Sequence, residues 1–298
     1  RAAVVGGAVV AVLAVLGLAA SAGGAGGLSV AEAVLLGLVE GITEWLPISS
    51  TGHLTVTQSL LGIDGDAANS YAIAIQAGAI LAVLGLYHER FVAMLRGVAG
   101  QDAAGRRVLL AVVVACLPAV VAALVFEDAI KQRLFGPWPV VIAWLVGGVV
   151  ILVFARRRRG VDPRAGAPLS ALAWRSALLI GLAQIFALWP GVSRSLTTIL
   201  AGVAVGLSVP AAVEFSFLLG FVVLGGATVY ETLSSGSTML AAYGLATPLI
   251  GLVVAFASAA AAMRWMVGYL NRHGLELFGW YRIAVAGVVG ALLVTGVL

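Results

Sequence analysis

The sequence has little charge and almost no cysteine. Only 10% of its 298 residues are Asp, Glu, Lys or Arg, whereas a soluble domain usually carries about 25%. Hydrophobic residues make up 62%, so polar groups cannot cover the surface, and an ordinary cytosolic enzyme or a disordered protein is excluded. Cys116 is the single cysteine, which rules out an internal disulfide. The sequence also lacks a Walker A loop, a glycine-rich dinucleotide motif and a zinc-ligand spacing. The composition instead indicates an integral membrane protein.

Several apolar runs are long enough to cross a bilayer, which takes about 20 helical residues. These predicted spans lie at 3–20, 69–87, 107–126, 137–155, 210–231, 243–263 and 281–298. Two further apolar regions, 29–62 and 172–207, are broken at 47–52 and 190–195. In each, a second arm too short to span follows the break, so we expect a re-entrant helix hairpin. The fold class expected is therefore an all-α polytopic membrane protein with about six to seven transmembrane helices and two re-entrant hairpins.

The arginines predict the orientation of these spans. The net charge is +4. The loop at 88–107 holds four arginines and the loop at 156–175 holds six, whereas the loop between them has only Lys131 and Arg133. Positive loops are normally cytoplasmic, so we expect both arginine-rich loops inside and the loop at 232–242 outside. The first hairpin then opens from the outside and the second from the inside.

The first 27 residues allow two interpretations. Arg1, an apolar stretch and the small residues at 20–22 are typical of a signal peptide with its cleavage site. The alternative is an uncleaved extra helix followed by a glycine-rich linker, and we favour it because 18 apolar residues can span a bilayer. Either interpretation delivers residue 28 to the outer face.

The two broken regions resemble each other. Gly37-Leu38-Val39-Glu40 matches Gly181-Leu182-Ala183-Gln184, and Trp, Pro and Ser follow at similar spacing in both. Three spans separate the copies, and an odd number inverts the second copy. Inverted repeats with broken helices place a ligand site where the halves meet. We therefore expect one membrane domain over 1–298, with halves at 29–155 and 172–298 and with the two breaks within about 15 Å of each other near the bilayer midplane.

Ionisable and hydroxyl side chains gather at the first break. Glu40 and Glu44 are spaced i, i+4 and share a helix face, so they need a metal, a shared proton or a nearby cation unless they lie solvated at a wet interface. Three hydroxyl residues follow them, Ser49, Ser50 and Thr51. One of these should cap the next short helix, whose free N–H groups suit an anion. His53, one turn inside that helix, can serve as an acid, a base or a nucleophile.

The second break supplies an arginine at the corresponding point. Arg194 lies between Ser193 and Ser195, with Thr198 one turn later. An arginine at membrane depth needs a phosphate or a carboxylate, and its planar fork matches phosphate oxygens. The alternative is a structural ion pair with Glu40, Glu44 or Glu214.

Three other polar residues lie within apolar spans, Gln76, Gln184 and Glu214. We expect them to support the catalytic groups without contacting the substrate. Glu214 should face the interior and support Arg194.

These groups together can bind a diphosphate and cleave it if the hairpins meet. Arg194 and the N–H groups would hold the developing charge, and the glutamates could carry a divalent cation. A hydroxyl or the imidazole would attack phosphorus or activate water. A site within the membrane implies a substrate with a lipid tail, so the residues alone predict a lipid phosphate or diphosphate hydrolase or carrier.

The segment EGITEWLPISSTGH at 40–53, together with PGVSRS at 190–195, closely resembles the bacterial undecaprenyl-diphosphatase family, the bacitracin-resistance proteins. The resemblance runs from about residue 29 to the C-terminus. It implies removal of the terminal phosphate of undecaprenyl diphosphate, which recycles the lipid carrier for peptidoglycan synthesis and gives bacitracin resistance. It also implies a Mg²⁺ or Ca²⁺ requirement and a site facing the outside of the bacterial cytoplasmic membrane. Leu196 stands where the family usually has glycine, and 1–27 is extra.

The motif match carries over seven residues, Glu40, Glu44, Ser50, His53, Ser193, Arg194 and Thr198. Of these, Ser193 and Thr198 are expected to bind the substrate phosphates with Ser49, Thr51 and Ser195, and the others to be catalytic. Either Ser50 or His53 can be the nucleophile. Expected partners are a polyprenyl diphosphate lipid, membrane lipids and, optionally, a second copy of the chain, but no nucleic acid. The main alternative is a transporter or flippase of a polyprenyl-phosphate carrier, and a structural membrane subunit would leave the embedded charges unexplained.

Overall fold

The computed structural model describes residues 27–298, except for the side chains of Glu127 and Lys131. The predictions of a span at 3–20, of its cleavage and of an extra segment therefore fall outside the described residues. Within them the chain is helical, and its one β-type contact is an isolated bridge between Ala167 and Leu207. The all-α class is confirmed.

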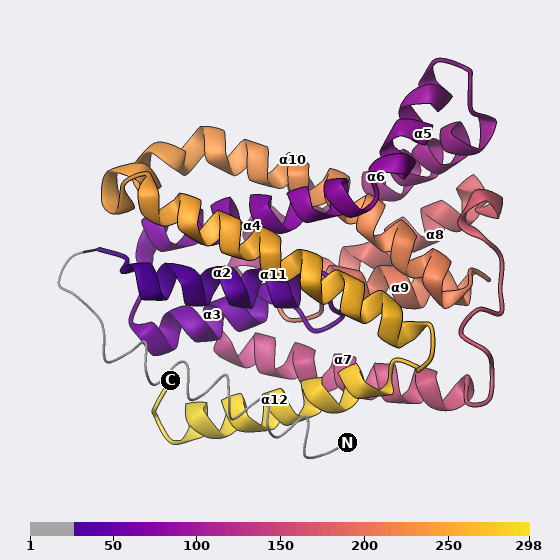
Figure 1. Cartoon of the computed structure of the whole chain (residues 1–298). Coiled ribbons are helices and arrows are strands. Elements are labelled where there is room, and N and C mark those ends of the chain that lie inside the picture. The colour runs from indigo at the N-terminus through magenta and orange to yellow at the C-terminus, as the bar shows by residue number, and fades with distance from the viewer. Residues whose placement is uncertain (1–26) are drawn as a thin grey trace.

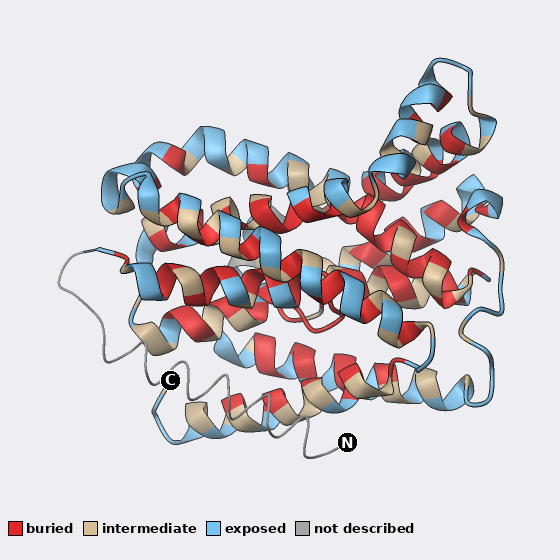
Figure 2. Cartoon of the chain, in the orientation of Figure 1, coloured by how far each residue is buried: buried red, intermediate tan, exposed pale blue. Residues whose placement is uncertain are grey.

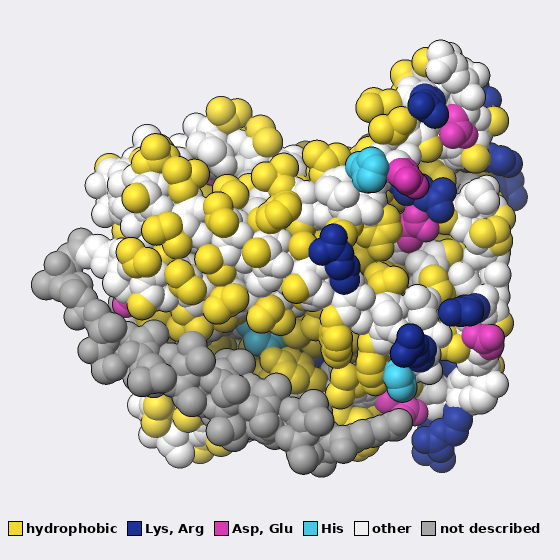
Figure 3. Space-filling model, viewed as in Figure 1, with side chains coloured by type: hydrophobic (Ala, Val, Ile, Leu, Met, Phe, Trp, Pro, Cys, Tyr) yellow, Lys and Arg dark blue, Asp and Glu magenta, His cyan; other side chains and the backbone are white. Residues whose placement is uncertain are grey.

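Six of the described helices are long and apolar enough to cross a membrane. They are α4 (Gly65–Leu86), α6 (Ala103–Leu134), α7 (Pro137–Arg157), α10 (Val209–Tyr243), α11 (Ala246–Leu270) and α12 (Glu276–Val294). They run from one end of the molecule to the other (Figure 1). Hydrophobic side chains cover much of the visible face between the ends, and most Lys and Arg side chains lie toward one end (Figure 3). This is the architecture of a multi-pass membrane protein.

Two stretches predicted as loops are helical. The residues at 232–242 belong to α10, and those at 127–134 belong to α6. Neither stretch contains proline, so its polar residues end the apolar run without ending the helix. The last span also begins earlier than predicted, because α12 starts at Glu276 and not at 281.

Each broken region forms a helix hairpin. The first consists of α2 (Val30–Glu44) and α3 (Ser50–Leu61). The second consists of α8 (Trp174–Gln184), a 3-10 turn and α9 (Arg194–Ala204). The two hairpins enter the bundle from opposite ends, as the inverted repeat predicts (Figure 1). Their re-entrance in a bilayer stays a prediction. The arginine-rich loops, including α5 (His88–Val98), lie at the end where the second hairpin opens.

The helix packing has the pattern that an inverted repeat produces. Helix α2 of the first half packs on α11 of the second, and α8 of the second half packs on α6 of the first. Helix α4 packs on its counterpart α10, and α7 packs on α12. Matching glycines allow two of these contacts. A Cβ on Gly37 would lie 2.6 Å from the Gly251 oxygen, and a Cβ on Gly181 would lie 2.5 Å from the Ala115 oxygen. The division into halves at 29–155 and 172–298 stays a prediction.

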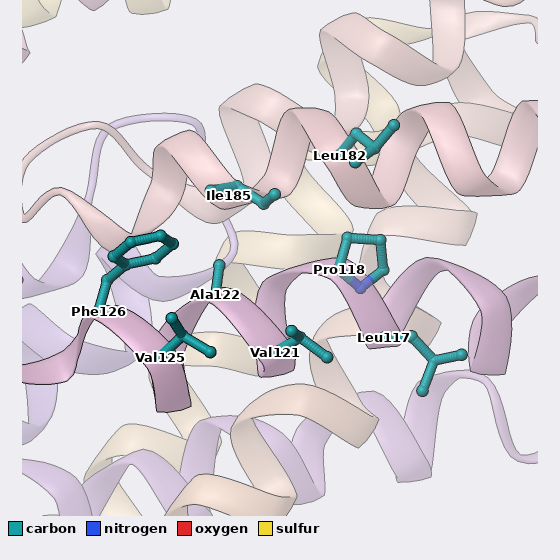
Figure 4. Close-up of a pocket in the computed structure, with 8 residues that line it drawn as sticks. All are labelled: Leu117, Pro118, Val121, Ala122, Val125, Phe126, Leu182 and Ile185. Atoms are coloured by element: carbon teal, nitrogen blue, oxygen red, sulfur yellow. The ribbon is translucent and has the colours of Figure 1, made fainter.

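An apolar groove lies near the second hairpin, between α6 and the arm formed by α8 and the 3-10 turn (Figure 4). Its lining is entirely apolar, formed by Leu117, Pro118, Val121, Ala122, Val125, Phe126, Leu182 and Ile185. The buried positions, by contrast, gather in the middle of the bundle (Figure 2). That interior is where the polar residues of the two breaks lie.

Candidate active site

The two breaks are in direct contact. The Ser195 hydroxyl donates a hydrogen bond of 2.8 Å to the Leu46 carbonyl. Residues at the first break also form hydrogen bonds with neighbouring helices, near the middle of each helix. The Trp45 indole donates to the Ala79 carbonyl of α4 at 3.0 Å, and the Trp144 indole of α7 donates to the Ile48 carbonyl at 2.8 Å. The prediction that the breaks approach each other is therefore correct, and their depth in a bilayer stays a prediction.

The same unusual backbone conformation occurs once in each break. Ser49 has φ 73° and Ser193 has φ 80°, and they are the only non-glycine residues with positive φ in the described chain. Each caps the short helix that follows. The Ser49 hydroxyl accepts from the Gly52 N–H at 3.5 Å, and the Ser193 hydroxyl accepts from the Leu196 N–H at 3.2 Å. Such strain persists only where the surroundings enforce it, and it clusters at functional sites.

Leu196 fits its position without a glycine conformation. It lies within α9, and its side chain is buried in the core. The departure from the family pattern therefore leaves the backbone at Arg194 regular.

Glu44 is the centre of the polar cluster. It accepts a short hydrogen bond from the Ser50 hydroxyl, and its Oε1 accepts from Arg194 Nη2 at 3.1 Å. Both partners of the ion pair are buried, since the side chain of Glu44 is 5% exposed and that of Arg194 is 9% exposed. The alternative of solvated glutamates is wrong. The cation that pairs with Glu44 comes from the other hairpin.

Arg194 is held from several sides. Its Nη1 donates to the Ser216 carbonyl at 2.8 Å, and its guanidinium lies 4.8 Å from the centre of the Trp45 ring. Thr198 closes this arrangement, because its hydroxyl donates to the Ser216 hydroxyl at 2.7 Å. The Nε–H of Arg194 is buried and has no hydrogen-bond partner among the described residues. Arg194 thus has the ion pair that we considered as an alternative and keeps one donor free.

Glu40 is a buried carboxylate without a hydrogen bond. Its residue is fully buried, and neither oxygen has a partner within the described chain. Its electrostatic neighbours are Glu44 and Gln76, and the Gln76 amide oxygen accepts from Thr228 at 3.2 Å. Gln184, which matches Glu40 in the repeat, is also buried, and neither of its amide atoms has a partner among residues 27–298.

Partnerless carboxylate oxygens beside a second carboxylate are the donors that a hard divalent cation prefers. Residues 27–298 contain no group of three His, Cys, Asp or Glu side chains placed to hold a metal. Mg²⁺ commonly uses only one or two carboxylates and completes its shell with substrate phosphates and water. Glu40 with Glu44 therefore fits such a cation.

His53 contacts a different part of the protein. Its Nδ1 lies 2.7 Å from the Ser49 carbonyl, and its Nε2 lies 2.9 Å from the Tyr281 hydroxyl. Its ring also packs against that of Trp144. Both ring nitrogens are therefore engaged.

Thr51 is exposed on the first turn of α3.

The other predicted phosphate-binding hydroxyls have structural partners. Ser193 and Ser195 lie 2.9 Å apart through their hydroxyl oxygens. Ser195 also donates to the Leu46 carbonyl, and Thr198 donates to the Ser216 hydroxyl. Their role toward phosphate stays a prediction. Of their contacts, the bond from Ser195 to the Leu46 carbonyl joins the two breaks.

The prediction that Glu214 supports Arg194 is wrong. It pairs with Arg90 of α5, and its side chain is 18% exposed. The reason is helical geometry, since residues two apart point to different faces. Ser216 faces Arg194, so Glu214 faces away from it.

Sequence reasoning missed Arg282. This arginine is fully buried in α12, and it donates to four backbone carbonyls, those of Pro47, Ala143, Trp144 and Gly191. The predicted span began at 281, which placed Arg282 at a membrane boundary. Its true position is inside α12, well within the second turn after the first residue, Glu276.

Known proteins share this sequence over most of its length. A family model described as bacitracin resistance protein BacA matches residues 33–288. A Sorangium cellulosum protein named undecaprenyl-diphosphatase is 47% identical over 261 residues, which cover 87% of this chain and 84% of that relative. An undecaprenyl-diphosphatase of Cupriavidus metallidurans is 44% identical over 284 residues, covering 90% and 96%. An undecaprenyl-diphosphatase 1 of Burkholderia thailandensis is 46% identical, covering 85% and 92%. The chain belongs to the bacitracin resistance protein BacA family.

Proposed function

We propose that this chain is an undecaprenyl-diphosphatase, which hydrolyses undecaprenyl diphosphate to undecaprenyl phosphate and inorganic phosphate. The observation that carries this function is the pair of contacts at Glu44, to Ser50 of its own hairpin and to Arg194 of the other. A base, a hydroxyl and a guanidinium thus form one buried cluster. Family membership and the names of the relatives support the same reaction.

Ser50 is the nucleophile in the reaction that this geometry favours. Its hydroxyl already donates to Glu44, so Glu44 takes the proton as the oxygen attacks the terminal phosphorus. The new Oγ–P bond replaces the bond to the bridging oxygen, and undecaprenyl phosphate leaves with that oxygen. Water then attacks phosphorus and breaks the Oγ–P bond. One proton of the water stays on the released phosphate and the other passes to solvent, while Glu44 returns its proton to the Ser50 oxygen.

His53 is less well placed for attack. A carbonyl only accepts, so Nδ1 must donate to the Ser49 carbonyl, and Nε2 is engaged by Tyr281. An attacking nitrogen would first have to break one of these contacts. We therefore assign His53 to holding the start of α3.

Arg194 has two tasks in this mechanism. Its Nη2 donates to Glu44 and holds that carboxylate oriented toward Ser50. Its free Nε–H and the adjacent helix starts at Ser50 and Arg194 supply donors for the charge that develops on the phosphoryl oxygens.

A divalent cation is the cofactor we propose, with Glu40 as its main ligand and Glu44 beside it. Glu40 qualifies because both of its oxygens are buried without a partner. Such a cation would neutralise charge on the diphosphate. Gln76 lies beside Glu40 and would help to hold its carboxylate in place once the cation is bound.

We place the site toward the outer face of the bacterial cytoplasmic membrane. The support is that the first hairpin opens at the end opposite the arginine-rich loops, which are expected to be cytoplasmic (Figures 1 and 3). The product would return to peptidoglycan synthesis, and its recycling would give bacitracin resistance. Labelling of single cysteines introduced at either end in whole cells, in a Cys116→Ala background, tests this orientation.

Phosphate release by the purified protein tests the function. We expect the protein in detergent to release phosphate from undecaprenyl diphosphate, and Ser50→Ala to reduce the rate by at least about 10²-fold. Ser59→Ala is the matched control, because Ser59 is exposed on the same helix. A carrier of polyprenyl phosphates would instead move the lipid between leaflets without releasing phosphate.

A further inference from the structure

Helix α12 places two consecutive residues against the breaks of both hairpins. It packs along α7 at one side of the bundle (Figure 1). From there Tyr281 contacts His53 and Arg282 contacts backbone of both breaks. The mechanism above uses neither residue.

Arg282 connects the two breaks through their carbonyls. Its Nη1 donates to the Pro47 oxygen at 3.3 Å, and its Nη2 donates to the Gly191 oxygen at 2.8 Å. It also donates to two carbonyls in the middle of α7, those of Ala143 at 2.8 Å and Trp144 at 3.3 Å. One side chain therefore holds the first break, the second break and a spanning helix.

The chemistry of arginine suits this position. A break in a helix leaves carbonyl oxygens without their helical hydrogen bonds. Within a bilayer, other groups of the protein must donate hydrogen bonds to these oxygens. Guanidinium offers five donors in a fixed plane, whereas lysine offers a point charge. The described residues form no ion pair with Arg282, so backbone carbonyls are its partners. Gly147 leaves the space, because a Cβ there would collide with the guanidinium.

Tyr281 fixes the imidazole beside the first break. Its hydroxyl lies 2.9 Å from His53 Nε2, and the two rings stack with centroids 5.7 Å apart. Nδ1 donates to the Ser49 carbonyl at 2.7 Å. In a neutral His53, Nε2 therefore accepts a hydrogen bond from the Tyr281 hydroxyl. The chain of contacts thus runs from α12 to Ser49, the strained cap next to Ser50.

We propose that Tyr281 and Arg282 are positioning residues of the phosphatase, which hold the two hairpin breaks where Ser50 of one and Arg194 of the other both reach Glu44. This inference rests on the proposed function. Displacement of a reacting group by about 1 Å can cost about 10²-fold in rate. Loss of the α12 contacts should therefore lower kcat more than it raises KM.

Kinetics of conservative variants test the proposal. Arg282→Lys keeps the charge but loses the fork, and Tyr281→Phe keeps the ring but loses the hydroxyl. We expect kcat per folded molecule to fall by about 10- to 100-fold in Arg282→Lys and by a smaller factor in Tyr281→Phe, with KM little changed. Arg264→Lys and Tyr230→Phe are matched controls, because both residues are exposed on other spans, α11 and α10. Wild-type kcat in both test variants would overturn the proposal.

A spectroscopic measurement gives a readout independent of turnover. In protein with ¹⁵N-labelled histidine, the sequence offers only His53, His88 and His273 to assign. We expect Tyr281→Phe to move the His53 Nε2 resonance toward that of an imidazole nitrogen without a hydrogen bond. An unchanged resonance would overturn the role of Tyr281.

The outcomes separate the two proposals. If Arg282→Lys does not fold, Tyr281→Phe decides through its kcat and its ¹⁵N spectrum. A wild-type protein that releases no phosphate would contradict the proposed function, whereas an active wild type with unaffected variants would contradict only the positioning role.

Discussion

Glu44 and Arg194 are 150 residues apart in the sequence and form a buried ion pair of 3.1 Å. Each comes from a different hairpin, and the hairpins enter the bundle from opposite ends (Figure 1). Neither half of the chain therefore contains the complete cluster. Since a buried charge without its partner is costly, the pair also ties the stability of one hairpin to the presence of the other.

Replacement of Glu44 by glutamine should remove the base while keeping the shape of the side chain. We expect phosphate release to fall by about 10²- to 10⁴-fold, the usual contribution of a general base. Glu89→Gln, at an exposed position on α5, should retain normal turnover. A Glu44→Gln protein with at least a tenth of the wild-type rate would mean that another group accepts the Ser50 proton.

Substitutions of Arg194 separate a catalytic from a purely structural arginine. Lysine can keep the ion pair with Glu44 but loses the fork that also reaches Ser216, so turnover should fall by about 10²-fold in a folded protein. Alanine should also lower the free energy of unfolding by about 3–5 kcal/mol, because it leaves Glu44 buried and unpaired. Phosphate release and thermal unfolding in detergent measure both effects. Normal turnover in Arg194→Lys would show that Arg194 has a structural role only.

Glu40→Gln tests the cation site. The partnerless carboxylate of Glu40 is costly to bury, so an amide of the same shape should leave thermal stability unchanged or raise it. The dependence of phosphate release on added Mg²⁺ should shift to higher concentration or disappear. An identical Mg²⁺ titration in the variant and the wild type would show that Glu40 does not hold the cation.

Close helix approach at the matched glycines can be tested with alanine. A Cβ at Gly181 would press on the Ala115 carbonyl of α6, so Gly181→Ala should destabilise the protein by about 1–3 kcal/mol. Gly287→Ala in α12 is the control, since nothing lies within 4 Å of its Cβ position, and it should be neutral or slightly stabilising. Equal unfolding temperatures for the two variants would argue against the tight α6–α8 contact.

The sequence predicts the hairpins and the meeting of their breaks because both depend on local signals. Proline and glycine stop the helices, and serine at 49 and 193 caps the next ones. The matched segments at 37–40 and 181–184 indicate the inversion. Residue type and spacing were therefore enough to bring Glu44 and Arg194 into one site.

The errors concern faces and ends of apolar helices. In a helix that is apolar all round, hydrophobic periodicity does not show which face contacts which neighbour. The sequence therefore predicts a contact between Glu214 and Arg194, although Glu214 pairs with Arg90. Helix ends in polar stretches, as at 232–242, were placed too early, and Arg282 was overlooked at the presumed start of its span.

Identification of the phosphorylated residue tests most directly whether Ser50, activated by Glu44, attacks the substrate. The purified enzyme would be mixed with undecaprenyl diphosphate labelled in its terminal phosphate and quenched within one turnover. One portion would be quenched in acid, which preserves phosphoserine, and the other in mild alkali, which preserves phosphohistidine, before digestion for peptide mass spectrometry. We predict acid-stable label on Ser50 in the wild type and none in Ser50→Ala, which should also lose turnover. Label on His53, or full phosphate release by Ser50→Ala, would contradict this mechanism.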